Sequence, residues 1–194
     1  MNSIVKLGLN LFIICAVAAL LLGITNQVTE PVIANRNIQS NNESRQIVLP
    51  DANEFILVSD DEYKNIDGII SEVYEGKNGS ETIGYTIKVI PKGYGGPIEL
   101  IVGILNDGTI SAINIGSMSE TPGLGAKASD SNFKDQFKGK QISELILIKG
   151  NISEKNEVSA ISGATITSSA VTDGVNVAID LFNSYLSKQG GYKV

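Results

Sequence analysis

One short segment near the end of the chain carries residue types from which a ligand site can be built. Residues 159–169 read SAISGATITSS, a run of small and hydroxyl-bearing residues directly before an amphipathic stretch. The first turn of a helix exposes N–H groups without partners in the helix, and these groups bind phosphate with help from the helix dipole. The same residues would also serve as a plain N-terminal helix cap with nothing bound. The segment alone leaves both interpretations open.

A second unusual segment, residues 116–129, reads GSMSETPGLGAKAS and follows a predicted strand. It has almost no bulky side chains, so backbone N–H groups can approach a flat ligand, and Glu120 and Lys127 flank it with opposite charges. The alternative is a wide turn that needs positive φ angles at Gly123 and Gly125. Taken alone, the turn is the simpler interpretation, because Pro-Gly loops are common turns.

Composition excludes several kinds of chemistry. The 194 residues include no histidine and one cysteine, which removes the Ser-His and Cys-His nucleophile pairs and the usual zinc and iron–sulfur ligand sets. No metal site is therefore expected. Acidic residues outnumber basic ones by 21 to 15 and tryptophan is absent, so nucleic acid is not expected as a partner.

The pattern of the second half of the chain predicts an α+β fold, an antiparallel sheet with flanking helices. Four runs rich in β-branched residues predict strands, with turn residues at 77–80 and 106–109 that favour hairpins: residues 69–74, 82–90, 98–105 and 110–115. A short helix is expected over 130–139, around Phe133 and Phe137. A longer final helix is expected from Ser168 or Ser169, which would cap it, to Leu186, with Gly190-Gly191 beyond its end.

A membrane anchor is predicted at the start of the chain. Residues 7–25 carry no formal charge, and 19 residues rising about 1.5 Å each can cross a hydrocarbon core of roughly 30 Å. Lys6 precedes the run and Glu30 follows it, which places the N-terminus in the cytoplasm and the rest outside. A cleaved signal peptide is the alternative, but its Ala16-Val17-Ala18 site would fall inside the apolar run. We expect three parts: an anchor over 1–28, a stalk or short helix over 29–53 and an extracytoplasmic domain over 54–194.

Together the two segments resemble the FMN-binding domain family, found in the G subunit of the Rnf ion-translocating electron-transport complex and in the C subunit of the sodium-translocating NADH:quinone reductase. Residues 162–168, SGATITS, are similar to the flavinylation motif of that family, and residues 120–125, ETPGLG, with Lys127 are similar to its ETPGLG-x-K loop. Residues 93–97, GYGGP, are similar to its GY-x-G segment. The resemblance covers nearly the whole chain and is nearest to the Rnf protein, because the anchor leads quickly into the sheet.

The resemblance implies a covalent flavin. FMN would be joined by a phosphoester to the hydroxyl of Thr165, with Thr167 the less favoured acceptor. A magnesium-dependent FMN transferase would attach it; that enzyme generally favours Asp three residues before the motif, where this chain has Ser159. The other residues implied to bind the cofactor are Ser162, Gly163, Ala164, Ser168, Glu120, Thr121, Gly123, Leu124, Lys127 and Tyr94.

The implied function is electron transport. The chain resembles a membrane-anchored flavoprotein subunit that carries electrons within an Rnf-type ferredoxin:NAD oxidoreductase driving ion translocation. It has no complete active site of its own, since no GxGxxG nicotinamide motif lies between a strand and a helix. Its expected partners are the other membrane subunits and the FMN transferase. The alternatives are a component like that of the quinone reductase, a stand-alone extracellular flavin-transfer protein, or a non-catalytic anchored binding or assembly module.

Overall fold

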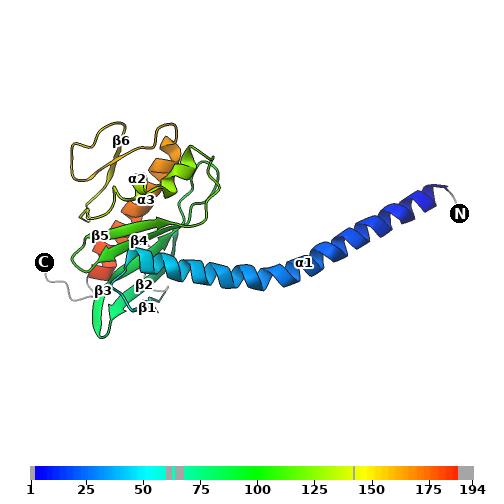
Figure 1. Cartoon of the computed structure of the whole chain (residues 1–194), viewed down its shortest axis with the longest axis horizontal. Coiled ribbons are helices and arrows are strands. Elements are labelled where there is room, and N and C mark those ends of the chain that lie inside the picture. Colours follow the sequence, from blue (N-terminus) through cyan, green and yellow to red (C-terminus); the bar gives the residue numbers. More distant parts are fainter. Residues whose placement is uncertain (1–2, 60–62, 64–67, 142, 188–194) are drawn as a thin grey trace. The chain divides into compact units, whose positions relative to one another are not determined.

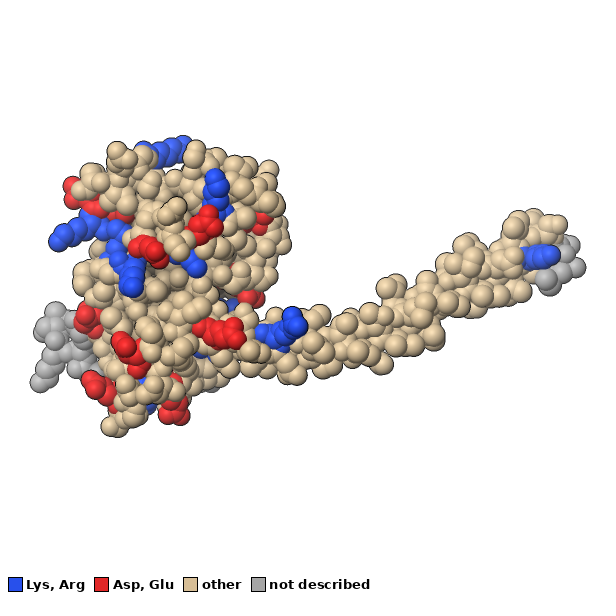
Figure 2. All heavy atoms as spheres, viewed as in Figure 1, with Lys and Arg blue, Asp and Glu red and all other residues tan. Residues whose placement is uncertain are grey.

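The computed structural model describes residues 3–59, 63, 68–141 and 143–187, which fall into two units divided between Asn41 and Asn42. The first unit is part of one long helix, α1 (Ser3–Val48) (Figure 1). This helix is long and apolar enough to cross a membrane, and its apolar side chains from Ile4 to Ile38 are exposed. Figure 2 shows a long stretch of it without any charged side chain.

The part expected to be a stalk or short helix, residues 29–53, is largely helical, but its boundary with the second unit lies elsewhere. The helix continues through Pro31 to Val48, and the second unit begins at Asn42 rather than at residue 54. Val48, Leu49 and Ala52 are fully buried in that unit. Only the last turns of the helix are covered, and Val32, Ile33 and Ile38 before them are exposed.

A five-stranded antiparallel sheet forms the centre of the second unit, with its strands in sequence order, which confirms the predicted α+β fold. Both predicted hairpins are present, and Gly79 (φ +62°) and Gly108 (φ +76°) supply the left-handed backbone of their turns. The strands are β1 (Glu54–Leu57), β2 (Ile70–Asn78), β3 (Glu81–Val89), β4 (Leu100–Leu105) and β5 (Ile110–Ile115).

One face of the sheet is covered by α3 (Thr165–Leu181) and the π-helical turn Phe182–Leu186 that continues it (Figure 1). The ring of Phe182 meets that of Tyr85 edge-on, with 6.1 Å between centroids. Gly174 lets the helix come close, since a Cβ there would lie 3.1 Å from a methyl group of Leu100. Burial of each large aliphatic side chain here stabilises the fold by about 1.5–3 kcal/mol, so this layer sets the position of the helix.

The opposite face of the sheet receives the end of α1. A Cβ at Gly103 would collide with the carbonyl oxygen of Val48, so the helix and the strand touch through their backbones. Arg45 holds the end of α1 against β2, because its Nη2 lies 2.7 Å from Glu72 Oε2 and its guanidinium lies 3.6 Å above the ring of Tyr74. The second unit is thus a sheet covered on both faces.

The remaining elements lie beside the sheet. The predicted short helix is present as α2 (Ser131–Lys134); the rings of Phe133 and Phe137 lie 5.5 Å apart, and Gly139 turns the chain at φ +76°. Two short parallel strands, β6 (Ile146–Ile148) and β7 (Glu157–Ser159), were not predicted. Three-residue strands carry too little periodicity to be recognised from sequence.

The predicted cap of the last helix is wrong. The helix begins at Thr165, after an N-cap at Ala164 without a side-chain hydrogen bond, so both proposed serines lie inside it. Ser168 Oγ donates to the carbonyl of Ala164, and Ser169 Oγ donates to Asp173 Oδ2. The hydroxyls therefore make other contacts, and Gly190-Gly191 lies outside the described residues.

The contact between α1 and β4 generates a stability prediction. Gly103→Ala should destabilise the fold by about 1–3 kcal/mol, because the added methyl group must displace the backbone of Val48. Gly68→Ala is the matched control, since a Cβ at Gly68 meets nothing within 4 Å. Chemical unfolding of the full chain in detergent measures both, and equal stability of the two variants would contradict this packing.

Candidate functional site

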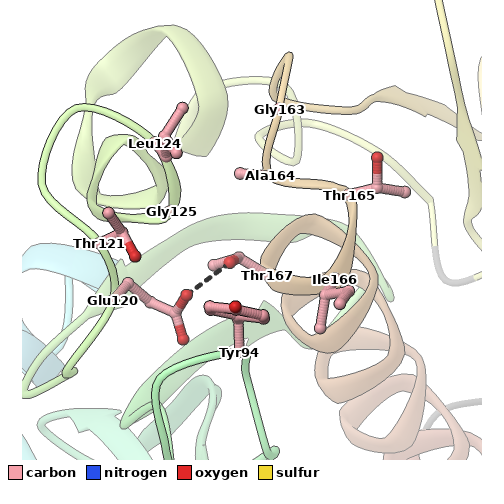
Figure 3. A pocket seen from close by; sticks show the side chains of 10 residues that line it. All are labelled: Tyr94, Glu120, Thr121, Leu124, Gly125, Gly163, Ala164, Thr165, Ile166 and Thr167. Carbon is pink, nitrogen blue, oxygen red and sulfur yellow. Dashed lines mark hydrogen bonds between the residues drawn. The ribbon is translucent and has the colours of Figure 1, made fainter.

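A pocket of about 530 Å³ opens where three segments meet beside the start of α3 (Figure 3). Tyr94 comes from the loop between β3 and β4, and Glu120, Thr121, Leu124 and Gly125 come from the loop after β5. Its size is within the range of about 300–1,000 Å³ of small-molecule sites. The third segment leads into α3 and contributes Gly163, Ala164, Thr165, Ile166 and Thr167.

Glu120 joins the three segments at the inner side of the pocket. Thr167 Oγ1 donates to Glu120 Oε2 over 2.6 Å (Figure 3). The Gly95 N–H donates to Glu120 Oε1 over 3.0 Å. Glu120 is only 8% exposed and Thr167 only 1%. Gly125 makes this arrangement possible, because a Cβ there would lie 2.5 Å from Glu120 Oε2 and 2.6 Å from Thr167 Oγ1.

Exposed apolar side chains surround the mouth of the pocket. Tyr94 is 71% exposed, Leu124 44% and Ile166 56%. Gly163, with φ +77°, brings the segment before α3 next to Leu124, because a Cβ at Gly163 would lie 3.2 Å from Leu124 Cδ2. Large apolar side chains left open around one hollow are typical of a ligand-binding site.

The two threonines of the motif differ in environment. Thr165 is the first residue of α3 and is exposed, and it lines both this pocket and an adjoining hollow of about 330 Å³. Thr167 is buried and hydrogen-bonded to Glu120. The unpaired N–H groups of the first helical turn lie beside Thr165 and favour negative charge there.

The structure brings most of the predicted site residues together. The pocket is lined by Tyr94, Glu120, Thr121, Leu124, Gly163, Ala164, Thr165 and Thr167. Lys127 and Ser162 line a neighbouring hollow of about 340 Å³ instead. Gly123 forms a turn at φ +77° and does not line the pocket, and Ser168 is fully buried, where its Oγ accepts from the Ile161 N–H over 3.0 Å.

Two lining residues, Gly125 and Ile166, were not among the predicted site residues. Both lie inside the two motifs, and a bulky apolar residue amid small and hydroxyl residues was the signal that could have identified Ile166. Among the described residues, no three acidic or cysteine side chains come together as a metal cluster.

Ser159, three residues before the motif, has a structural role in β7. Its N–H donates to Gln136 Oε1 over 2.7 Å, and its Oγ donates to the Gly150 carbonyl over 2.7 Å. These bonds hold the strand that leads into the motif.

Comparison with known proteins identifies the class. The family model of the FMN-binding domain matches residues 93–180. The fold is that of two solved structures, the C subunit of the Na⁺-translocating NADH-quinone reductase from Parabacteroides distasonis and NqrC from Shewanella oneidensis. The first has a TM-score of 0.54 at 19% identity over 75% of this chain and 94% of that one. The second has a TM-score of 0.55 at 19% identity over 79% and 96%. The chain has an FMN-binding domain of the NqrC-like fold.

Similarity along the whole sequence narrows the family further. The G subunit of the Na⁺-translocating ferredoxin:NAD⁺ oxidoreductase complex of Acetobacterium woodii is 46% identical, over 94% of this chain and 93% of that protein. The G subunit of the proton-translocating complex of Clostridium ljungdahlii is 36% identical over 95% and 94%. The chain belongs to the G-subunit family of ion-translocating ferredoxin:NAD⁺ oxidoreductase complexes, known as Rnf.

The turn before β7 generates a pH prediction. The Ser153 and Glu154 N–H groups and the Ser153 hydroxyl donate to Glu157 Oε2, and these bonds hold the pKa of Glu157 below its ordinary value of 4.5. A lowered pKa in the folded state means that the carboxylate stabilises the fold above pH 4.5 and loses that effect as the pH falls through the folded pKa.

We therefore expect Glu157→Gln to lower the melting temperature at pH 7, with a difference from the natural chain that disappears in acid. Glu154→Gln, which leaves these bonds in place, is the control. Melting curves from pH 7 to pH 3 measure this. A difference that persists unchanged to pH 3 would show that the carboxylate charge is not its source.

Proposed function

We propose that this chain carries FMN on Thr165 and passes electrons through it as the membrane-anchored flavoprotein subunit of an Rnf-type complex. The observation that carries the proposal is the contrast between two hydroxyls of one motif. Thr165 is exposed at the rim of the pocket, whereas the Thr167 hydroxyl is buried against Glu120. A modifying enzyme needs a hydroxyl that it can reach, and of the two threonines Thr165 meets that condition.

The residues around Thr165 fit a flavin. The apolar side chains of Tyr94, Leu124 and Ile166 stand open around a hollow of about 530 Å³, and Gly163 and Gly125 leave room for a close approach. The N-terminus of α3 supplies N–H donors and the positive end of a dipole for the one remaining charge of a phosphodiester. When bound, FMN supplies the reversible uptake of electrons.

The roles of the chain's own groups follow from their chemistry. Leu124, Ile166 and Tyr94 would shield a bound flavin from water, and the Thr121 hydroxyl could donate a hydrogen bond to it or accept one from it. Thr165 holds the cofactor permanently, which matters because a dissociable flavin outside the cytoplasm would be lost by dilution. The first turn of α3, anchored by its packing on the sheet, fixes where the tether begins.

Attachment of the cofactor by the FMN transferase would be a transfer of the flavin phosphoryl group to the threonine hydroxyl. Thr165 Oγ1 would form a bond to the flavin phosphorus of a flavin dinucleotide, and the pyrophosphate bond of that dinucleotide would break. The nucleoside monophosphate leaves, and the proton of the threonine hydroxyl passes to solvent. No electrons are transferred in this step, so the flavin arrives ready for redox chemistry.

Helix α1 supports the proposed location. Its uncharged stretch suits a single crossing of the cytoplasmic membrane, with the N-terminus inside and the flavin domain on the outer face. The partners would be the other membrane subunits of the complex. The sequence identities of 46% and 36% to Rnf G subunits favour this assignment over an NqrC-like role, which rests on fold similarity at 19% identity.

The acceptor residue can be tested by paired substitutions. Coexpressed with a transferase, the natural chain and Thr165→Ser should carry covalent FMN, because both present a hydroxyl at the helix start. Thr165→Ala should fold but lose it completely. Intact mass and flavin fluorescence of the denatured protein measure this. A natural chain without the FMN mass increment would leave a non-catalytic anchored module as the better interpretation, and flavin retained in Thr165→Ala would assign another acceptor.

The topology can be tested with introduced cysteines, since Cys15 is the only native one. In a Cys15→Ser background, Lys155→Cys should react with a membrane-impermeant maleimide on intact cells. Ser3→Cys should react only after the cells are permeabilised. Labelling of Ser3→Cys in intact cells would reverse the proposed orientation.

A further inference from the structure

Glu120 stands out among the described residues that line the pocket, because it is the only one with a formal charge. It is 8% exposed, and both oxygens accept hydrogen bonds, one from the Gly95 N–H and one from Thr167 Oγ1. Both donors are neutral. Lys127, the cation of the same loop, lines the neighbouring hollow instead. A negative charge therefore lies in the pocket wall without a cation in the described lining.

The hydrogen bonds by which Glu120 connects the loops do not by themselves explain why this residue is charged. Burying a carboxylate against neutral partners costs free energy, and an amide could bond the same two partners at lower cost, accepting from the Gly95 N–H and donating to the Thr167 hydroxyl. Two glycines also leave room for this side chain, since a Cβ at Gly93 or Gly125 would collide with its oxygens. A charge retained at such a cost is expected to act on something that the pocket holds.

We propose that the charge of Glu120 lowers the reduction potential of the bound flavin. This inference rests on the proposed function. Reduction adds electron density to the ring, and a buried anion beside it raises the free energy of the reduced flavin more than that of the oxidised flavin. The pocket wall, partly shielded from water, screens this effect less than bulk solvent would. Glu120 is then an electrostatic residue that makes the flavin a stronger electron donor.

The test compares reduction potentials of the full-length flavinylated chain in detergent, measured by spectroelectrochemical titration at one pH. Glu120→Gln keeps the shape and removes the charge, so its potential should shift to a more positive value. Glu144→Gln removes an exposed carboxylate from outside the pocket lining and should leave the potential unchanged. Thr167→Val keeps the charge and removes one hydrogen bond, so its potential should not become more positive.

The outcomes separate charge from structure. The proposal is overturned if Glu120→Gln folds, carries covalent FMN and has the same reduction potential as the natural chain. It is also overturned if the potential of Thr167→Val shifts to a more positive value by as much as that of Glu120→Gln. If Glu120→Gln does not fold or carries no FMN, the Thr167→Val variant decides. A more positive reduction potential of its flavin overturns the proposal, and an unchanged or more negative one supports it. A natural chain without covalent flavin is a different result, which refutes the proposed function itself.

Discussion

The hydrogen bond between the buried carboxylate of Glu120 and the hydroxyl of Thr167 is the contact on which the pocket depends. It connects residues 47 positions apart, and the second oxygen of the same carboxylate holds the loop of Gly95. Three segments distant in sequence therefore meet at one side chain. Their glycines matter because a carboxylate can be this closely enclosed only where the neighbouring backbone carries no Cβ.

The position of Thr165 is set by packing some distance away. The later turns of α3 lie on the sheet through Gly174 and Phe182, and the helix transmits that position to its first residue. The other face of the same sheet is covered by the end of α1, where Arg45 bonds to Glu72 and stacks on Tyr74. Because both faces are covered, the strands that carry the pocket loops have little freedom to shift.

The two units are governed by opposite constraints. In the second unit the large apolar side chains are buried in a core, while in the first unit the apolar side chains of α1 are exposed along most of its length. A helix with apolar side chains exposed in this way is stable where the surrounding medium is itself apolar. Membership of the Rnf G-subunit family agrees with this division, since the curated relatives cover both parts of the chain.

Local sequence was sufficient for the four strands β2 to β5, both hairpins, the apolar run and the two motifs, because each depends on short-range periodicity or on residues that tolerate positive φ. It misplaced the start of the last helix and the end of the expected stalk. Hydroxyl residues can cap a helix or bond elsewhere, and Val48 and Leu49 are buried only because the sheet lies against them. The preference for Thr165 over Thr167 came from the family resemblance, because local sequence gives the two threonines of the motif no different physical environment. Tertiary structure gives the two threonines different environments. The Thr167 hydroxyl is bonded to Glu120, which lies in a loop that no local sequence pattern places next to this helix.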